Sequence, residues 1–127
     1  MTQPASILVV DDNADNRKLV ERMLKRRGIA LIAHAQNAAE CLRALEARPF
    51  DVILMDISMP EVSGVELCQI VRRQPHGNDV QIVACTAHAS KKDAESFLQT
   101  GFDSVLSKPF LMEDLYKAIG MDPTATP

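Results

Sequence analysis

Residues 51–60 read DVILMDISMP, an apolar run that stops abruptly at a carboxylate. The run is short and rich in β-branched and bulky side chains, which favours a strand buried on both faces of a parallel sheet. Asp56 then lies at the carboxyl end of that strand, the edge where open α/β sheets bind ligands. Because an isolated buried charge is costly, Asp56 needs a polar, charged or metal partner from elsewhere in the chain.

The 127 residues suffice for one domain with a substantial core. We expect that domain over residues 4–120, with flexible ends at residues 1–3 and 121–127. No apolar run approaches the roughly 20 residues of a membrane span, and the first residues do not resemble a secretion signal. A cytoplasmic protein with no membrane association is therefore the expectation.

The charge argues against nucleic-acid binding, and the cysteine spacing argues against a cysteine metal site. A net charge of −3 offers no general attraction for nucleic acid. Cys41, Cys68 and Cys85 lie within apolar patterns and lack the spacing of metal ligands. We interpret them as reduced thiols that pack in or near the core.

Short apolar runs alternate with helical patterns along the whole chain. The predicted strands cover residues 7–10, 29–33, 52–56, 80–85 and 104–107. The predicted helices cover residues 15–27, 38–47, 65–73, 91–100 and 111–119. Every connection is short, which indicates right-handed crossovers. The pattern predicts an α/β fold, a doubly wound parallel five-stranded sheet with helices on both faces.

Polar residues follow or end four of these strands. Asp11 and Asp12 follow the first strand, and Asp56 ends the third. Thr86 follows the fourth strand and Lys108 follows the fifth. If the strand order is 2-1-3-4-5, the first and third strands are neighbours and the three carboxylates meet at the switch point. Hard oxygen ligands that leave room for water suit Mg²⁺, and Mn²⁺ can substitute for it.

A metal, a hydroxyl and an ammonium around a carboxylate form an arrangement suited to phosphoryl transfer. Asp56 can act as the nucleophile and become an acyl phosphate. The Thr86 hydroxyl and the Lys108 ammonium can hydrogen-bond or neutralise the phosphoryl oxygens. The combination carries this interpretation, since each residue alone also fits an ordinary structural role.

Four segments of the chain resemble those of a known family. They are VVDDN at 9–13, LMDISMP at 54–60, CTAHA at 85–89 and LSKPF at 106–110. In this order and spacing they resemble the signature segments of response-regulator receiver domains, from two-component signalling. The resemblance covers the whole chain and implies the flavodoxin-like (βα)5 fold with strand order 2-1-3-4-5.

The resemblance also implies an activity. Asp56 would be phosphorylated by a histidine kinase or a phosphotransfer protein and would lose the phosphoryl group slowly. Such a domain catalyses both steps at its own Asp56 and is not a conventional enzyme. Mg²⁺ would be held by Asp11, Asp12, Asp56 and the backbone carbonyl of Ile57.

The same resemblance assigns further roles near the fifth strand. Thr86 and Lys108 would sense the phosphoryl group, and the peptide between Lys108 and Pro109 would be cis. The family's usual switch aromatic lies three residues before the lysine, where this chain has Val105. Because valine has no ring to turn inward, the signal can instead pass through the loop after Thr86 and the fourth helix, or the chain can serve as a phosphate relay or sink.

Two residues are candidates for tuning the lifetime of the acyl phosphate. Ser58 and His88 each lie two positions beyond a site residue, so both should flank the point where water attacks. An exposed histidine without catalytic duty is an equal alternative for His88. We interpret His34 and His76 as structural or surface residues.

The segment DDNADNRKLV at residues 11–20, with its Asn13 and Asn16, resembles receivers attached to hybrid histidine kinases. An excised receiver and a single-domain regulator are therefore the leading interpretations. A downstream effector or an attached kinase would bind the face formed by the fourth helix, the fifth strand and the fifth helix. The apolar candidates on that face, some of which must be core, are Phe97, Phe110, Leu111 and Tyr116.

Two alternative functions remain open from the sequence. A pseudo-receiver that only binds partners is suggested by Val105. A Mg²⁺-dependent phosphatase would use Asp11 as its nucleophile, but its second acid would stand two residues later, where this chain has Asn13.

Overall fold

The computed structural model describes residues 4–87 and 89–121. His88 and the two ends that we expect to be flexible, residues 1–3 and 122–127, lie outside the described residues. Met121, which we assigned to the flexible end, instead packs in the core with 5% of its surface exposed. Its N–H donates to the Tyr116 carbonyl oxygen at 2.8 Å. The ordered packing therefore extends one residue beyond the predicted boundary.

Five parallel strands form one sheet, and their order β2-β1-β3-β4-β5 is the predicted one. The strands are β1 (Ser6–Val10), β2 (Leu31–Ala35), β3 (Val52–Asp56), β4 (Gln81–Thr86) and β5 (Ser104–Ser107). All five residues of β3 are buried, as expected for a central strand covered on both faces. The chain reverses its direction of winding between β1 and β3, so the switch point lies beside Asp56.

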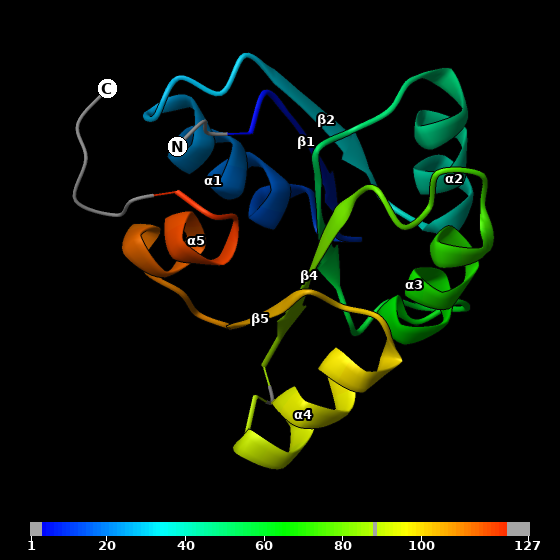
Figure 1. Ribbon diagram of the computed structural model, residues 1–127. Helices are drawn as coiled ribbons and strands as arrows, with labels where there is room; N and C mark the ends of the chain where they lie inside the picture. The colour runs from blue at the N-terminus through cyan, green and yellow to red at the C-terminus, as the bar shows by residue number, and fades with distance from the viewer. Residues whose placement is uncertain (1–3, 88, 122–127) are drawn as a thin grey trace.

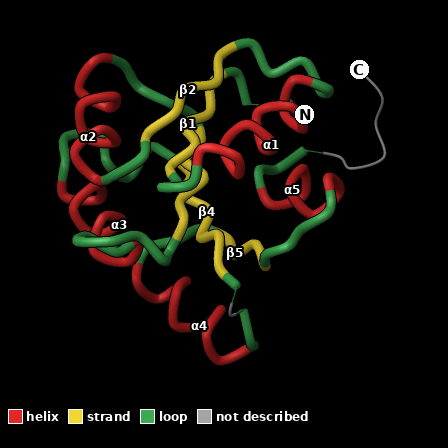
Figure 2. Tube along the Cα trace, turned by 180° about the vertical axis from the view of Figure 1, so that it is seen from behind, coloured by secondary structure: helices red, strands yellow, loops and turns green. Residues whose placement is uncertain are grey.

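Five helices alternate with the strands and cover both faces of the sheet (Figure 1). They are α1 (Ala14–Lys25), α2 (Ala38–Ala47), α3 (Gly64–Arg73), α4 (Lys91–Thr100) and α5 (Met112–Ala118). Helices α1 and α5 lie on one face, and α2 and α3 lie on the other (Figure 2). Helix α4 lies beside β5 and α3. Its Phe97 packs against the part of the core that α2 and α3 cover. The predicted fold class is confirmed.

Polar caps fix the starts of four helices. The side chains of Asn13, Asn37, Ser63 and Ser90 each accept a hydrogen bond from the backbone N–H three residues later. Such caps satisfy backbone donors that the first turn leaves unpaired. Because Asn13 caps α1, that helix begins immediately after the two acids that follow β1.

Strand β2 starts two residues later than its predicted position at residues 29–33. The cause is the end of α1, where Gly28 has a positive φ of 78° and the Ile29 N–H donates to the Leu24 carbonyl oxygen. This Schellman arrangement uses Ile29 to close the helix. His34 consequently lies within β2, and its ring pairs with Glu21 of α1.

Helix α4 is the most weakly packed helix, since none of its residues is buried. Its carboxyl end is held by Arg72 of α3, whose guanidinium donates twice to the Gly101 carbonyl oxygen, at 2.8 and 3.0 Å. The same guanidinium donates to Asp103 at 2.8 Å and to the carbonyl oxygens of Gly77 and Val80. Arg72 therefore joins α3, the end of α4 and the starts of β4 and β5.

All three cysteines are buried and free, as predicted. Among the residues that the structure describes, no helix has the length and apolar character needed to cross a membrane.

Candidate functional site

Three carboxylates meet where β1 and β3 end. Oxygens of Asp11, Asp12 and Asp56 all lie within 4.8 Å of one another. Asp11 and Asp56 are buried, with 7% and 5% of their surfaces exposed, whereas Asp12 is exposed. Two buried acids at this spacing repel each other and require positive charge. An exposed third acid leaves an approach for water and ions, so the donor set fits Mg²⁺, which keeps several waters when bound.

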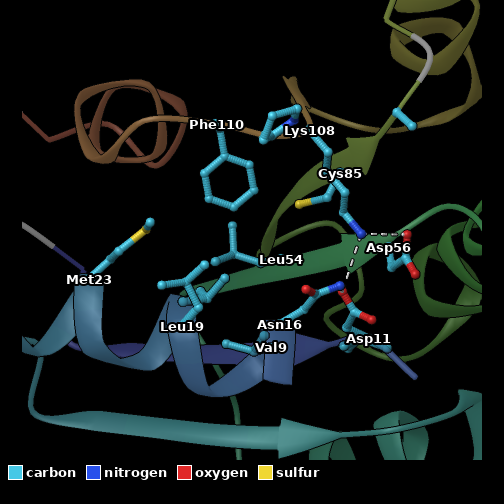
Figure 3. A pocket seen from close by; sticks show the side chains of 14 residues that line it. Val9, Asp11, Asn16, Leu19, Met23, Leu54, Asp56, Cys85, Lys108 and Phe110 are labelled. Carbon is cyan, nitrogen blue, oxygen red and sulfur yellow. Dashed lines mark hydrogen bonds and ion pairs between the residues drawn. The ribbon is translucent and has the colours of Figure 1, made fainter. Parts of the chain in front are cut away.

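Lys108 supplies positive charge to this cluster (Figure 3). Its Nζ lies 3.1 Å from Asp56 Oδ1 and 3.3 Å from Asp11 Oδ2. Its backbone N–H donates to the Thr86 carbonyl oxygen at 2.8 Å, which ties the loop after β5 to the end of β4. The peptide between Lys108 and Pro109 is cis, the isomer that the family resemblance implies.

Burial raises the pKa of Asp56 above its ordinary value, and the charge of Asp11 adds to this effect. The hydrogen bond and charge of Lys108 act in the opposite direction but do not outweigh burial. Burial would lower the pKa of Lys108, yet the two carboxylates hold that pKa above its ordinary value. The ammonium therefore stays charged near neutral pH and bridges the two buried acids.

Two more predicted residues, Thr86 and Ser58, lie around this centre. Thr86 is the last residue of β4 and is buried, one position beyond Cys85, which pairs with Asp56 in the sheet register. The backbone N–H of Ser58 donates to Asp56 Oδ1 at 3.3 Å, while the residue itself is exposed. His88, the second tuning candidate, lies outside the described residues.

The Ile57 carbonyl oxygen already accepts two hydrogen bonds. The N–H groups of Met59 and Gly64 donate to it, at 3.2 and 3.0 Å. Since a carbonyl oxygen has two lone pairs, metal binding by Ile57 would require one of these bonds to open. The carboxylates are the better supported part of the predicted ligand set.

Arg17 is a site residue that the sequence reasoning missed. Its guanidinium Nη1 donates to the Asp11 carbonyl oxygen at 2.6 Å. The Asp11 side chain is also fixed, because its carboxylate accepts bonds from the Asn13 N–H at 2.9 Å and the Asn16 amide at 3.5 Å. The signal was present as an arginine six residues after Asp11, but helix spacing alone does not show that a side chain reaches back to a strand end.

Gly64 is the second missed residue. A methyl group added there would lie 2.4 Å from the Asp56 carbonyl oxygen and 2.8 Å from the Ile57 Cα. The first turn of α3 therefore rests directly on the backbone of the central carboxylate. Only glycine allows so close an approach.

Val105 lies on β5 opposite Ala84, partly buried against the core beneath α2, α3 and α4. Of the four apolar candidates for an output face, Tyr116 is instead a core residue. Its hydroxyl donates to the Met23 carbonyl oxygen at 2.7 Å, and Arg27 stacks on its ring. Leu111 is 67% exposed, whereas Phe97 and Phe110 are partly buried.

A groove of about 320 Å³ leads away from the acids between α1 and the segment after β5. We call it the α1 groove. Asp11, Asn16, Asp56 and Lys108 line its polar end (Figure 3). Apolar side chains line most of the remainder, among them Val9, Leu19, Val20, Met23, Leu54 and Phe110.

The fold is that of the receiver domains of two-component signalling, and sequence comparison agrees. The sequence model of the response regulator receiver domain matches residues 7–120. The chain belongs to the response regulator receiver domain family.

Individual relatives are of two kinds. The chain is 34% identical to the sensor histidine kinase GacS of Pseudomonas protegens and 31% identical to the histidine-protein kinase BarA of Escherichia coli. These matches cover 89% and 90% of this chain but only 12% of each kinase. A 14.6 kDa protein of Leptolyngbya boryana is 41% identical, over 81% of this chain and 78% of its own length.

Among solved structures, the chemotaxis response regulator CheY4 of Vibrio cholerae superposes with a TM-score of 0.82 at 31% identity. The comparison covers 89% of this chain and 93% of CheY4. The receiver domain of a signal transduction histidine kinase from Syntrophus aciditrophicus gives a TM-score of 0.80 at 26% identity, covering 91% of this chain and 86% of that one.

Proposed function

We propose that this receiver domain accepts a phosphoryl group on Asp56 in a Mg²⁺-dependent reaction. The observation that carries the proposal is Lys108 Nζ placed between Asp56 Oδ1 and Asp11 Oδ2 in a cluster of three acids. A nucleophilic carboxylate, a cation beside it and oxygen ligands for a metal are the parts that phosphoryl transfer requires.

The Asp56 carboxylate is oriented before the donor arrives. Its Oδ1 accepts hydrogen bonds from Lys108 Nζ and the Ser58 N–H. We therefore assign nucleophilic attack to Oδ2, which forms a new bond to phosphorus as the bond to the donor breaks. The Lys108 ammonium and the Thr86 hydroxyl then stabilise charge on the phosphoryl oxygens.

Asp11, Asp12 and Asp56 would hold the metal. When bound, Mg²⁺ neutralises charge on the phosphoryl group during transfer. Arg17 and Asn13 fix Asp11 through its carbonyl and carboxylate oxygens, so that the acid is aimed at the site. The Ile57 carbonyl joins this set only if it gives up a hydrogen bond.

Loss of the phosphoryl group would follow attack by water at the exposed mouth of the site. Ser58 is exposed there and holds Asp56 through its backbone, so its side chain is placed to govern the access of water. We keep His88 as a second tuning residue on its sequence position alone. Both reactions occur at the domain's own Asp56.

The donor would be a histidine kinase or a phosphotransfer protein in the cytoplasm. The similarity to segments of GacS and BarA, both named as histidine kinases, supports this assignment. A downstream effector or attached kinase would bind the face of α4, β5 and α5, where Leu111 is exposed. Because Val105 supplies no ring, we propose that the loop after Thr86 and α4 transmit the phosphorylated state.

The test is incubation with Mg²⁺ and acetyl phosphate, followed by intact-mass measurement. The wild type should gain one phosphoryl mass, and Asp56→Asn should not. Asp15→Asn is the matched control, because Asp15 is an exposed acid of α1 outside the three-acid cluster. If the wild type takes up no phosphoryl group, the proposal is overturned.

A further inference from the structure

A second cavity lies at the edge of the sheet opposite the three acids. It is formed by the carboxyl-terminal ends of α2 and α3, which lie side by side on one face of the sheet (Figure 2). Phe50 and Val80, which come just before β3 and β4, are among the residues that line it. Because β3 runs from this edge to Asp56, the length of the strand separates the cavity from the acids. We call it the α2–α3 cavity.

The α2–α3 cavity has the size and lining of a small-molecule site. Its volume is about 690 Å³, against about 320 Å³ for the α1 groove, and small-molecule sites span about 300–1,000 Å³. Burial of an apolar group here would supply most of the binding free energy, because most of the lining is apolar. The apolar lining includes Leu42, Leu45, Pro49, Phe50, Val71 and Val80.

The wall formed by the loop at residues 74–79 is held in place by contacts within the protein. Gly77 packs so tightly on the end of α3 that a methyl group added to it would overlap the Val71 carbonyl oxygen. The Arg72 guanidinium donates to the carbonyl oxygens of Gly77 and Val80, at 2.8 and 2.7 Å. A wall that is already fixed in this way costs a ligand little ordering.

Four ionisable side chains line the cavity, and two of them partner each other. His76 Nδ1 lies 3.3 Å from Asp79 Oδ2. Within the described part of the chain, neither Glu46 nor Arg48 forms an ion pair. The cavity therefore offers a ligand one carboxylate and one guanidinium, which lie two residues apart at the end of α2.

Arg48 is positioned to bind a carboxylate. Its guanidinium carbon lies 5.2 Å from the centre of the Phe50 ring, and its Nε donates to the Pro49 carbonyl oxygen at 3.1 Å. These contacts use one face of the guanidinium and its Nε. The two terminal nitrogens can therefore bind both oxygens of a ligand carboxylate.

Glu46 is positioned to bind a cation. It lies in the last turn of α2, and that turn contains no basic residue. The carbonyl groups at the end of a helix add negative potential, which favours a cation there. A ligand ammonium beside Glu46 would gain from both effects.

We propose that the α2–α3 cavity binds a small zwitterion with a bulky apolar group, the chemistry of an apolar α-amino acid. The ligand ammonium would pair with Glu46 and its carboxylate with Arg48. The apolar group would lie against Leu45, Phe50 and Val71. A ligand with a single charge would leave either Glu46 or Arg48 without a partner. This inference does not depend on phosphorylation of Asp56.

The test is titration of the protein with L-tryptophan, followed by methyl NMR. The signals of Leu42, Leu45, Val71 and Val80 should shift saturably, and those of Leu19 in the α1 groove should not. Indole-3-propionate lacks the ammonium and tryptamine lacks the carboxylate, so each should bind about two- to fivefold more weakly, the usual effect of one exposed ion pair. L-Alanine should produce no shift at the same concentrations, because it lacks the bulky apolar group.

Two variants assign the charges separately. Glu46→Gln should weaken L-tryptophan and tryptamine about two- to fivefold and should not weaken indole-3-propionate. Arg48→Gln should weaken L-tryptophan and indole-3-propionate to a similar extent and should not weaken tryptamine. Arg43→Gln and Glu95→Gln are the matched controls, since both residues are exposed and lie outside the cavity; both should bind all three ligands as the wild type does.

The remaining outcomes overturn the proposal. They are the absence of a saturable shift and shifts confined to other parts of the molecule. If indole-3-propionate or tryptamine binds as tightly as L-tryptophan, the two charges do not select the ligand. The proposal then fails, and the cavity serves an apolar side chain of a partner protein instead.

Discussion

Gly64 and Asp56 are in such close contact that a methyl group on Gly64 would lie 2.4 Å from the Asp56 carbonyl oxygen. The start of α3 and the strand that ends at Asp56 therefore cannot move independently. A change at the first helical residue is transmitted to the backbone of Asp56.

Gly64→Ala should destabilise the domain by about 1–3 kcal/mol, the usual cost of overpacking a tight contact. It should also slow phosphorylation of Asp56, because the displaced backbone misplaces the carboxylate. Denaturant unfolding and the acetyl phosphate reaction measure the two effects. Gly120→Ala is the control for the phosphorylation rate, since a methyl group there has no atom within 4 Å. Unlike Gly64, Gly120 has a positive φ of 82°, so its substitution strains the backbone without any contact with Asp56. Equal slowing in both variants would contradict the assigned contact.

Lys108→Met should tighten metal binding while it slows phosphorylation. Removal of the ammonium leaves Asp11 and Asp56 without their bridging charge, so a divalent cation relieves more repulsion. Two unit charges about 4 Å apart interact by about 4 kcal/mol at an effective dielectric constant near 20, and part of this should appear as roughly tenfold tighter binding. Titration with Mn²⁺ monitored by EPR measures the affinity. Lys25→Met, on the exposed side of α1, serves as the control, and weaker binding in Lys108→Met would refute the bridging role.

Arg17→Ala should weaken Mn²⁺ binding by about 1–2 kcal/mol, since Asp11 loses a charge-assisted hydrogen bond to its carbonyl oxygen. Arg17→Lys should recover part of this loss because lysine retains the charge and a donor. Arg22→Ala removes an arginine from the last turn of the same helix and should leave affinity unchanged. The positioning role is excluded if all three variants bind the ion alike.

The buried cysteines should resist alkylation in the native state. Burial raises the pKa of Cys41 and Cys85 to about 12, and it also raises the pKa of Cys68. At pH 8 a thiol with a pKa of about 12 has roughly a thousandfold less reactive thiolate than one with the ordinary value of 9.0. Iodoacetamide should therefore label the unfolded chain quickly and the native protein slowly, as mass spectrometry would show. Rapid native labelling of Cys41 would contradict its burial.

Arg72→Met should cost about 2–4 kcal/mol of unfolding free energy, because it leaves several carbonyl oxygens without their shared donor. The neighbouring Arg73 is exposed, so Arg73→Met should change stability little. Urea unfolding of both variants gives the comparison. Hydrogen exchange should also show faster opening at the carboxyl end of α4 in Arg72→Met alone.

The sequence predicted the features that depend on local pattern. Apolar runs located the strands. The acids and the lysine at their ends lie together as predicted, because parallel strands bring their carboxyl ends to one edge. Asn37 and Ser90, each directly before a predicted helix, cap α2 and α4. The start of β2 was not predicted, because Ile29 could either close a helix or begin a strand. The hydrogen bond from the Ile29 N–H to the Leu24 carbonyl oxygen decides between these two roles.

The parts of the site that escaped prediction depend on distance in space. Arg17 reaches back from α1 to a strand end, and Gly64 is needed only because α3 rests on Asp56. The α1 groove likewise arises where Leu19 of one helix faces Phe110 of a distant loop. No periodicity in the sequence encodes these approaches.

Helix α4 buries none of its side chains completely and is anchored at its carboxyl end by Arg72. An element with so few core contacts has a low free energy of local displacement. Under the proposed phosphorylation of Asp56, a modest bias would be enough to displace α4, even with valine at residue 105. The domain thus holds its three acids at the end of a buried sheet, while α4 is the helix that the core holds least.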